Sequence, residues 1–396
     1  MTSRSVPGLL QVVRRFGRFD VNACLGCGSC TVVCSLATDS RSFPRKPMRR
    51  ALLGLRDSLR GGLEPWLCHD CGECAVTCPR QAEPRESMMT LRRYLIAQYD
   101  FTHIASRVLG SRLGEILTLS LVGLLVLALV LVYHLTYKEI PMTLSEFVAT
   151  PFGLEHMFPT IQNFTMVVFA IPIVLLLINM LRMHHFTARE LEPFHIPLRC
   201  YFLEVKSLLV HMLSHKNMRA CADAVLKRRW AKHWLVAFAV SLMLFVKFFF
   251  LDWFQTDAIH PIYHPQRWLG YAAAALMLYV PLDILISRAR KRVEMHKFSA
   301  PSDLILPAML FLVALSGLAV HVFRYLEFGL TSHILYAVHL TIAVPLVLIE
   351  LPFGKWSHGF YRAFALYFQA VRERAMAEAQ SKEPLHDIVP AGVEST

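Results

Sequence analysis

The sequence predicts a mainly α-helical protein with two parts, a soluble N-terminal region and a bundle of six membrane-spanning helices. Two observations lead to this prediction. Of the 396 residues, 55% are hydrophobic, and the mean hydropathy is +0.43, which is too high for an ordinary soluble protein. The apolar residues are also unevenly spread, because residues 1–110 are charged and rich in arginine whereas long apolar runs follow them.

Two runs of four cysteines with identical spacing lie in the N-terminal region. Each run reads C-x2-C-x2-C-x3-C, and Pro79 directly follows the second. The first run supplies Cys24, Cys27, Cys30 and Cys34, and the second supplies Cys68, Cys71, Cys74 and Cys78. Three cysteines at this spacing wrap around one [4Fe–4S] cluster, and a short helix carries the fourth to the other cluster.

We therefore expect a helical, ferredoxin-like domain with two [4Fe–4S] clusters over residues 1–110. One cluster is expected on Cys24, Cys27, Cys30 and Cys78, and the other on Cys68, Cys71, Cys74 and Cys34. Structural zinc is the first alternative, but its fourth ligand usually lies much further along the chain than three residues. Disulfides are the second, but the first 20 residues lack the apolar core of an export signal. Cys200 and Cys221 lie outside both runs and are expected to be ordinary thiols.

Six apolar runs are long enough to cross a bilayer, which takes about 20 residues of helix. They cover residues 113–134, 161–181, 233–252, 268–287, 303–323 and 334–353. We expect them to form a transmembrane cytochrome b domain over residues 111–365, ahead of a cytoplasmic tail over residues 366–396. The loop 182–232 has apolar residues at helical spacing and a basic polar face, which predicts an amphipathic helix on the inner membrane surface.

The basic residues alternate between loops. Segments 182–232, 288–302 and 355–396 hold ten, five and five Lys and Arg residues, whereas segments 135–160, 253–267 and 324–332 hold one each. The positive-inside rule then places the cluster domain, the basic loops and the C-terminus in the cytoplasm, at the inner membrane. We interpret the net charge of +12 as a sign of topology and of contact with anionic membrane lipid, and not of nucleic-acid binding.

Histidines at bilayer depth are costly and mark functional sites. Clusters pass single electrons, and b-type haem held between helices by imidazoles accepts them one at a time. His233 and His358, at the inner ends of the third and sixth spans, are expected to hold an inner haem. His339 is expected to hold an outer haem, with His321 as the first choice of partner and Met243 as the second. The histidines of the basic loop are expected to be solvated or lipid-facing: His184, His185, His195, His211 and His215.

Three charges lie inside the predicted spans, namely Lys247, Asp283 and Glu350. A quinone site needs a hydrogen-bonding group and a route for protons. Lys247 could bind a quinone carbonyl near the outer haem, or it could snorkel outward past Trp253 or pair with Asp252. Asp283 and Glu350 could line a proton route or pair with basic residues near the inner face.

The chain resembles two families of electron-transfer proteins. Residues 20–110, with "PWLCHDCGECAVTCPR" and the following "LRRYLIAQ", resemble the small iron–sulfur subunit of heterodisulfide reductases. Residues 160–365, with "RRWAKHW" and "HLTIAVPLVLIELPFGKWSH", resemble the cytochrome b subunit of those enzymes and the gamma subunit of respiratory nitrate reductase. One chain that joins both parts resembles the fused membrane subunit of the quinone-interacting membrane-bound oxidoreductase complex of sulfate-reducing organisms.

The resemblance implies two [4Fe–4S] clusters, two b haems and menaquinone as the membrane redox partner. It also implies two soluble flavin- and cluster-containing subunits, and adenylylsulfate reductase as the downstream partner. The nitrate reductase gamma subunit carries two haem histidines ten residues apart on the helix that matches the third span. Here Met243 stands at the second of those positions.

The sequence thus predicts a membrane electron-transfer subunit that links menaquinol to cytoplasmic partners. No nucleophile, phosphate-binding loop or nucleotide fingerprint is visible, so we expect no reaction on a soluble substrate by this chain alone. Two alternatives are the membrane subunit of a heterodisulfide-reductase-type complex, whose partner reduces a disulfide, and a membrane-bound redox sensor.

Overall fold

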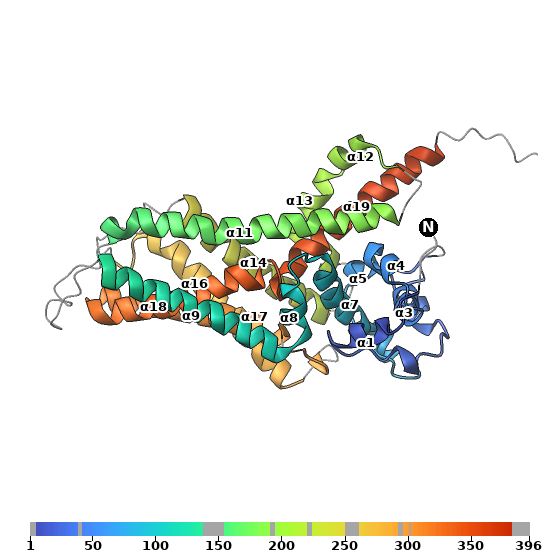
Figure 1. Cartoon of the computed structure of the whole chain (residues 1–396), viewed down its shortest axis with the longest axis horizontal. Coiled ribbons are helices and arrows are strands. Elements are labelled where there is room, and N and C mark those ends of the chain that lie inside the picture. Colours follow the sequence, from blue (N-terminus) through green and yellow to red (C-terminus); the bar gives the residue numbers. More distant parts are fainter. Residues whose placement is uncertain are drawn as a thin grey trace, which may run out of the picture.

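The computed structural model describes residues 5–38, 42–137, 154–190, 195–219, 224–249, 261–291, 296–300 and 302–381. Every regular element within these ranges is a helix, as the sequence predicts. The helices form two regions along one long axis. A long bundle occupies one end, and short helices of the N-terminal region are gathered at the other (Figure 1).

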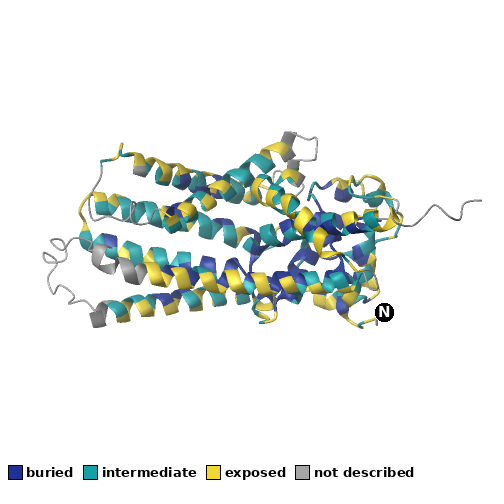
Figure 2. Cartoon of the chain, turned by 90° about the horizontal axis from the view of Figure 1, so that it is seen from above, coloured by how far each residue is buried: buried dark blue, intermediate teal, exposed yellow. Residues whose placement is uncertain are grey.

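Six helices of the bundle are long and apolar enough to cross a membrane. They are α9 (Arg112–Tyr137), α11 (Leu154–Arg189), α14 (Ala224–Phe249), α16 (Pro265–Ala289), α17 (Ser302–Tyr325) and α18 (Gly329–Pro345). Each overlaps one of the predicted apolar runs, so the prediction of six membrane-length helices is confirmed. Large apolar side chains such as Leu121, Leu124 and Val167 are more than half exposed, and exposed positions run along the outer faces of the bundle (Figure 2). Such faces suit contact with lipid.

The sixth span ends in a change of helix geometry. α18 ends at Pro345, and η4 (Leu346–Glu350) continues as a wider π-helical turn. The short η5 (Lys355–Ser357) then leads into α19 (His358–Gln380). Pro352 has no backbone N–H to continue the helical hydrogen bonds. His358 therefore begins a new helix and does not extend the sixth span.

The N-terminal region is built around α7 (Pro84–Tyr99), which is buried along almost all of its length. The other helices are α1 (Leu9–Arg14), η1 (Val21–Ala23), α2 (Ser29–Val32), α3 (Arg45–Leu52), α4 (Arg56–Gly61), α5 (Glu64–Leu67), α6 (Glu73–Val76) and α8 (Ile104–Gly110). Helices of one or two turns are not stable alone. Packing of α1, α3, α5, α6 and α8 on α7 therefore holds the region together.

The basic segment 182–232 forms several pieces, not one amphipathic helix. α11 continues through Arg189, and α12 (Leu198–Leu203), α13 (Val205–Ser214) and η2 (Lys216–Arg219) follow it. α13 packs on α19, which runs across the expected domain boundary at residue 365. Tyr367, Phe368 and Val371 are buried on α19, so packing keeps the expected tail helical as far as Gln380. Cys221 and residues 382–396 lie outside the described residues.

The N-terminal region and the bundle share one core, where buried positions are concentrated in Figure 2. Trp66 of α5, Tyr99 of α7 and Tyr361 of α19 are all fully buried. The rings of Trp66 and Tyr361 stack with their centroids 5.2 Å apart, and Phe186 of α11 stacks on Tyr99 at 6.1 Å. Stacked aromatic pairs contribute about 1 kcal/mol beyond the area that they bury. The two regions are therefore joined by a packed interface.

Candidate functional site

The two cysteine runs adopt the same local geometry. In each run the backbone N–H two residues after the first cysteine donates to its sulfur, from Gly26 to Cys24 at 3.4 Å and from Asp70 to Cys68 at 3.3 Å. Gly26 and Asp70 both have positive φ, which turns the chain around the sulfur. The short helices α2 and α6 follow and pack against each other. The two runs therefore form a structural repeat with one paired helix from each.

One cavity is lined by Cys24, Cys27 and Cys30 of the first run together with Cys78 of the second. This is the crossed set that the spacing predicts. Cys27 is exposed and the other three cysteines are half-buried, so this set lies near the surface. The backbone N–H of Ala82 donates to the sulfur of Cys78 at 3.3 Å, and a hydrogen bond with the Ser29 hydroxyl lowers the pKa of Cys27. Both contacts stabilise thiolates, the form that binds iron.

The second set lies deeper in the protein. It consists of Cys34 from the first run with Cys68, Cys71 and Cys74 from the second, and these thiols lie close enough to interact with one another. Burial, followed by repulsion from Cys68 and Cys71, raises the pKa of Cys34 to about 11. Such thiols would stay protonated on their own. Bound metal supplies the positive charge that deprotonates its ligands, so this set suits an iron–sulfur cluster.

A single metal ion would fit these side chains less well than a cluster. Among the described residues, no three Cys, His, Asp or Glu side chains converge tightly enough to hold one ion. Each thiolate of a [4Fe–4S] cluster binds a different iron, so the sulfurs of such a set stand further apart than the ligands of one ion.

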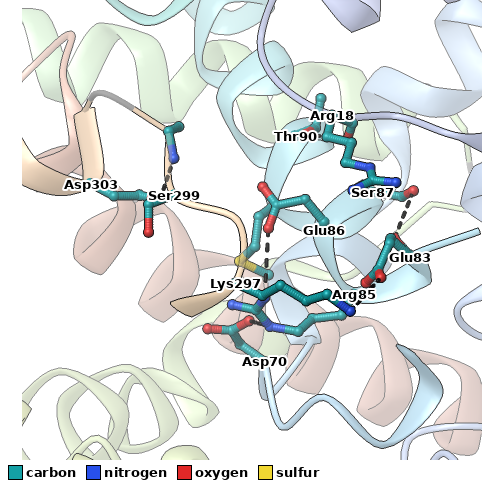
Figure 3. Close-up of polar contacts among 12 residues, drawn as sticks. Arg18, Asp70, Glu83, Arg85, Glu86, Ser87, Thr90, Lys297, Ser299 and Asp303 are labelled. Carbon is teal, nitrogen blue, oxygen red and sulfur yellow. Dashed lines mark hydrogen bonds and ion pairs between the residues drawn. The ribbon is translucent and has the colours of Figure 1, made fainter. Parts of the chain in front are cut away.

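Asp70 joins the second cysteine set to the membrane bundle. Its carboxylate accepts hydrogen bonds from Nε of Arg85 at 2.6 Å and from Arg229 of α14, and Arg229 also donates to its backbone oxygen at 2.8 Å. Burial alone would raise the pKa of Asp70, but Arg229, Arg85 and Arg92 hold it below its usual range. Figure 3 shows Asp70 beside Arg85, which also reaches Glu86. These charge-assisted contacts fix residues 68–72, the segment between α5 and α6, on α14. We call this segment the Cys68 loop.

Arg92 and Arg93 are adjacent on α7, but Arg92 contacts the Cys68 loop whereas Arg93 contacts α17 of the bundle. Arg92 donates to the backbone oxygen of Cys68 at 2.6 Å and to that of Pro65 at 2.8 Å. Arg93 pairs instead with Glu86 and with Asp303 at the start of α17. Because a guanidinium group offers several donors in one plane, α7 orients the Cys68 loop relative to the bundle.

His233 of α14 and His358 of α19 lie next to each other. Their ring centroids are 6.0 Å apart and their planes meet at 76°. Two imidazoles that share one iron, each with a nitrogen about 2 Å from it, have ring centres about 6 Å apart. Nδ1 of His358 contacts the backbone oxygen of Lys355, an arrangement that leaves Nε2 for a metal. Burial lowers the pKa of His358 to about 3, so the imidazole is neutral, as a ligand must be.

A third histidine joins this pair. His215, expected to be solvated or lipid-facing, is half-buried instead, and its ring centroid lies 4.8 Å from that of His233. Nδ1 of His215 and Nδ1 of His233 have no hydrogen-bond partner among the described residues. His215 directly follows α13, in a left-handed backbone conformation that ends the helix. His211 lies inside α13, which packs on α19, and both histidines are close enough to Arg362 of α19 to interact with it electrostatically. No local sequence signal marks His215, because its position depends on this packing.

The expected outer haem ligands are arranged differently. His339 of α18 faces α17, where its Nδ1 lies 3.0 Å from the hydroxyl of Ser316. His321 lies further along α17, and its ring nitrogens contact Arg267 at 3.0 Å and Tyr271 at 2.9 Å. These contacts engage both nitrogens of His321. The pairing of His339 with His321 stays a prediction.

Met243 and Lys247 lie one turn apart on α14. Met243 is 40% exposed, and Lys247 is half-buried and close enough to His339 to interact with it electrostatically. Lys247 therefore lies near His339, the expected ligand of the outer haem. Its alternative neighbours Asp252 and Trp253 lie outside the described residues. The roles of Met243 and Lys247 stay predictions.

The two intramembrane carboxylates have different surroundings. Asp283 pairs with Lys232, which is one of the two uses expected for it. Glu350 is fully buried, and one of its oxygens accepts a hydrogen bond from the backbone N–H of Lys355 at 3.0 Å. Its carboxyl group faces that of Glu115 on α9, which is 1% exposed. Two facing carboxyl groups have the chemistry to pass a proton.

Comparison with known proteins identifies the N-terminal region. Residues 20–82 match the family of 4Fe-4S dicluster domains, so the chain carries such a domain. The chain is 33% identical to a heterodisulfide reductase C-like protein of Archaeoglobus profundus over 102 residues, 26% of this chain and 54% of the relative. It is 38% identical to a CoB–CoM heterodisulfide reductase iron-sulfur subunit of Methanocaldococcus jannaschii over 72 residues, 18% of this chain and 38% of that relative. The chain thus spans about half of these relatives or less.

A longer similarity reaches beyond the cluster domain. Citrate utilization protein B of Escherichia coli is 25% identical over 333 residues, which cover 79% of this chain and 83% of the relative. An alignment of that length includes most of the helical bundle. No solved structure matches the chain. The chain is therefore an iron–sulfur protein, and its described residues include six membrane-length helices.

Proposed function

We propose that this chain is the membrane electron-transfer subunit of an oxidoreductase complex. It carries electrons between menaquinol in the inner membrane and soluble flavin- and cluster-containing subunits in the cytoplasm. Its carriers are two b haems and two [4Fe–4S] clusters. The dicluster domain supports the clusters. The intramembrane histidines and the basic loops support the haems and the cytoplasmic orientation.

The observation that carries the proposal is a short connection between the inner histidine pair and the second cysteine set. On α14, Arg229 binds Asp70 in the Cys68 loop. His233 follows Arg229 by four residues, which is about 6 Å along the helix and on the same face. One helical turn therefore separates the cluster loop from a candidate haem ligand.

The helix of the second candidate ligand makes a matching contact. Tyr361, one turn after His358 on α19, stacks on Trp66, which precedes Cys68 by two residues. Both candidate ligands of the inner haem are thus held by helices that also hold the Cys68 loop. This arrangement supports the proposal, because it would hold a haem and a cluster at a fixed distance, as electron transfer between them requires.

The geometry also supports an order for the two proposed clusters. The set of Cys34, Cys68, Cys71 and Cys74, which would hold the proximal cluster, is the more buried one and adjoins the bundle through the ion pair of Asp70 with Arg229. The set of Cys24, Cys27, Cys30 and Cys78, which would hold the distal cluster, lies near the surface, where a soluble partner could approach it. We therefore propose the order outer haem, inner haem, proximal cluster, distal cluster, partner.

The quinone site is proposed at the opposite end of the bundle from the clusters. His339 holds the outer haem there, with His321 or Met243 as its partner, and Lys247 binds a quinone carbonyl. The proximity of Lys247 to His339 supports this. The facing carboxyl groups of Glu115 and Glu350 are proposed to pass protons at the cytoplasmic end of the spans.

The soluble partner has two candidates. Adenylylsulfate reductase follows from the resemblance to the quinone-interacting complex. A partner that acts in citrate utilization follows from the similarity to Citrate utilization protein B, which covers 79% of this chain. The greater length of that similarity favours the second. Identification of the chain that co-purifies, together with its flavin content, decides between them.

The substitution Arg229→Gln tests the connection. It removes the ion pair with Asp70 and so loosens the Cys68 loop on α14, at a cost of about 2 kcal/mol for a charged hydrogen bond. Haem content and the spectrum of the inner haem should be unchanged, whereas reduction of the proximal cluster by the haem should slow by about tenfold or more. Rapid-mixing spectroscopy with a short-chain menaquinol measures both.

Lys232→Gln is the matched control. It removes a positive charge and an ion pair from the same helix, but Lys232 pairs with Asp283 and not with the cluster loop. Cluster reduction in Lys232→Gln should match that of the unchanged protein. Unchanged cluster reduction in Arg229→Gln, or equal slowing in both variants, would contradict the proposed connection.

A further inference from the structure

A large cavity lies where the cluster domain meets the membrane-length helices, apart from both cysteine sets. Its walls come from the segment just after α1, from α7 and the end of α8, from the start of α9 and the end of α16, and from the segment before and within the start of α17. One candidate span begins at Arg112, another ends at Ala289 and a third begins at Ser302. All three of these positions line or border the cavity, so it opens at the level of the membrane surface.

The cavity carries a surplus of positive charge. Seven Lys and Arg residues line it, against the acids Glu86 and Glu115. Arg93 and Arg288 are compensated by ion pairs with Asp303. The other lining cations include three that are exposed and form no ion pair with any described residue: Arg15, Arg112 and Lys291. Cations left unpaired around one opening attract an anion.

The cavity also has an apolar wall and a buried carboxyl group. Phe16, Leu109 and Leu304 also line the cavity, and Leu113 and Leu117 are exposed along α9 just beyond it. Glu115 lines the cavity with a side chain that is 1% exposed. Its carboxyl group faces that of Glu350, and apart from that carboxyl group no described residue donates a hydrogen bond to its Oε1. The site thus offers cations, an apolar wall and one buried acceptor.

We propose that this cavity binds an anionic phospholipid whose headgroup carries a hydroxyl, such as phosphatidylglycerol. The phosphate lies among Arg15, Arg112 and Lys291, and a headgroup hydroxyl donates to Oε1 of Glu115. The acyl chains follow the exposed leucines of α9. A free phosphate would leave the apolar wall unused. The cavity has a volume of about 730 Å³, within the roughly 300–1,000 Å³ of common ligand sites, so a headgroup fits.

The location at the junction gives the lipid a physical effect. Basic pockets on the cytoplasmic side of a membrane bind such headgroups, and each nearby cation strengthens binding by roughly fivefold. A lipid held here touches both the segment after α1 in the cluster domain and α9 of the bundle. Its binding therefore favours the docked arrangement of the two regions.

The test uses the full-length holoprotein in detergent, titrated with phosphatidylglycerol and followed by native mass spectrometry. One lipid should bind, and the double variant Arg112→Gln, Lys291→Gln should bind it about thirtyfold more weakly. The control double variant Lys206→Gln, Arg228→Gln makes the same charge change on cations that do not line the cavity and should bind as the unchanged protein does. If the double variant fails to fold, the single variant Lys291→Gln replaces it in the test, because Lys291 is exposed. It should bind the lipid about fivefold more weakly.

Two further probes identify the source of the anion. Phosphatidylethanolamine, which has no net charge, should bind at least about tenfold more weakly, and inorganic phosphate should not displace the lipid. Equal binding of both lipids, displacement by inorganic phosphate, or equal weakening in the control variant would overturn the proposal.

Discussion

Replacing His358 with alanine should stop electron transfer from quinol to both clusters while one haem remains reducible. The change removes one imidazole from the inner iron, and the open position is filled by water or stays empty. That haem becomes high-spin or is lost. The outer haem, proposed at His339, is untouched. We expect the rate of cluster reduction by a menaquinol analogue to fall by about a hundredfold or more, because loss of even a supporting residue costs 10–100-fold at such sites.

Three companion variants give this experiment its controls. His233→Ala should behave as His358→Ala does. His339→Ala should stop reduction of both the inner haem and the clusters, since the entry point for electrons is gone. His215→Ala should keep a low-spin inner haem, although the ring of His215 lies 4.8 Å from that of His233. If His215→Ala abolishes the low-spin signal while His233→Ala preserves it, the axial ligand is His215.

Replacing Cys34 with serine should remove the proximal cluster and isolate the distal one from the haems. The distal cluster keeps its four thiolates, so about half of the cluster iron should remain, because each run contributes one ligand to the other cluster. Electron paramagnetic resonance of the dithionite-reduced protein should show one cluster. Quinol should reduce both haems but not that cluster.

In the crossed scheme Cys30 of the first run and Cys78 of the second run bind the same cluster. Cys30→Ser and Cys78→Ser should therefore have the same effect. Both should remove the distal cluster, and in both quinol should still reduce the proximal cluster. Ligation within each run would instead pair Cys78→Ser with Cys74→Ser. Survival of both clusters in Cys30→Ser, or loss of the same cluster in Cys34→Ser and Cys30→Ser, would refute the crossed scheme.

The short-range patterns of the sequence predicted the elements of this molecule well. The cysteine spacing alone predicts which thiols meet, because the three-residue step carries Cys34 and Cys78 across to the opposite run. Hydropathy likewise predicted six membrane-length helices, since about 20 apolar residues are needed to span a bilayer. His233 and His358 could be paired because the basic loops indicate which ends of the third and sixth spans face inward. One of the two histidines lies at each of those ends.

Contacts between distant segments could not be predicted in the same way. Asp70 lies inside a cysteine run, and nothing local indicates that Arg229, 159 residues later, binds it. His215 looked like a loop histidine because its burial depends on the packing of α13 on α19. The continuation of α19 past residue 365 has the same origin, namely apolar side chains that meet a surface formed elsewhere in the chain.

The time course of reduction after mixing with menaquinol tests the central claim most directly. Full-length protein with its clusters and haems is mixed with a short-chain menaquinol, and haem absorbance and freeze-quenched electron paramagnetic resonance are followed together. The account predicts that haem is reduced first, then the proximal cluster, and the distal cluster last. Clusters that are reduced while the haems stay oxidised, or a purified protein that contains no haem, would contradict it.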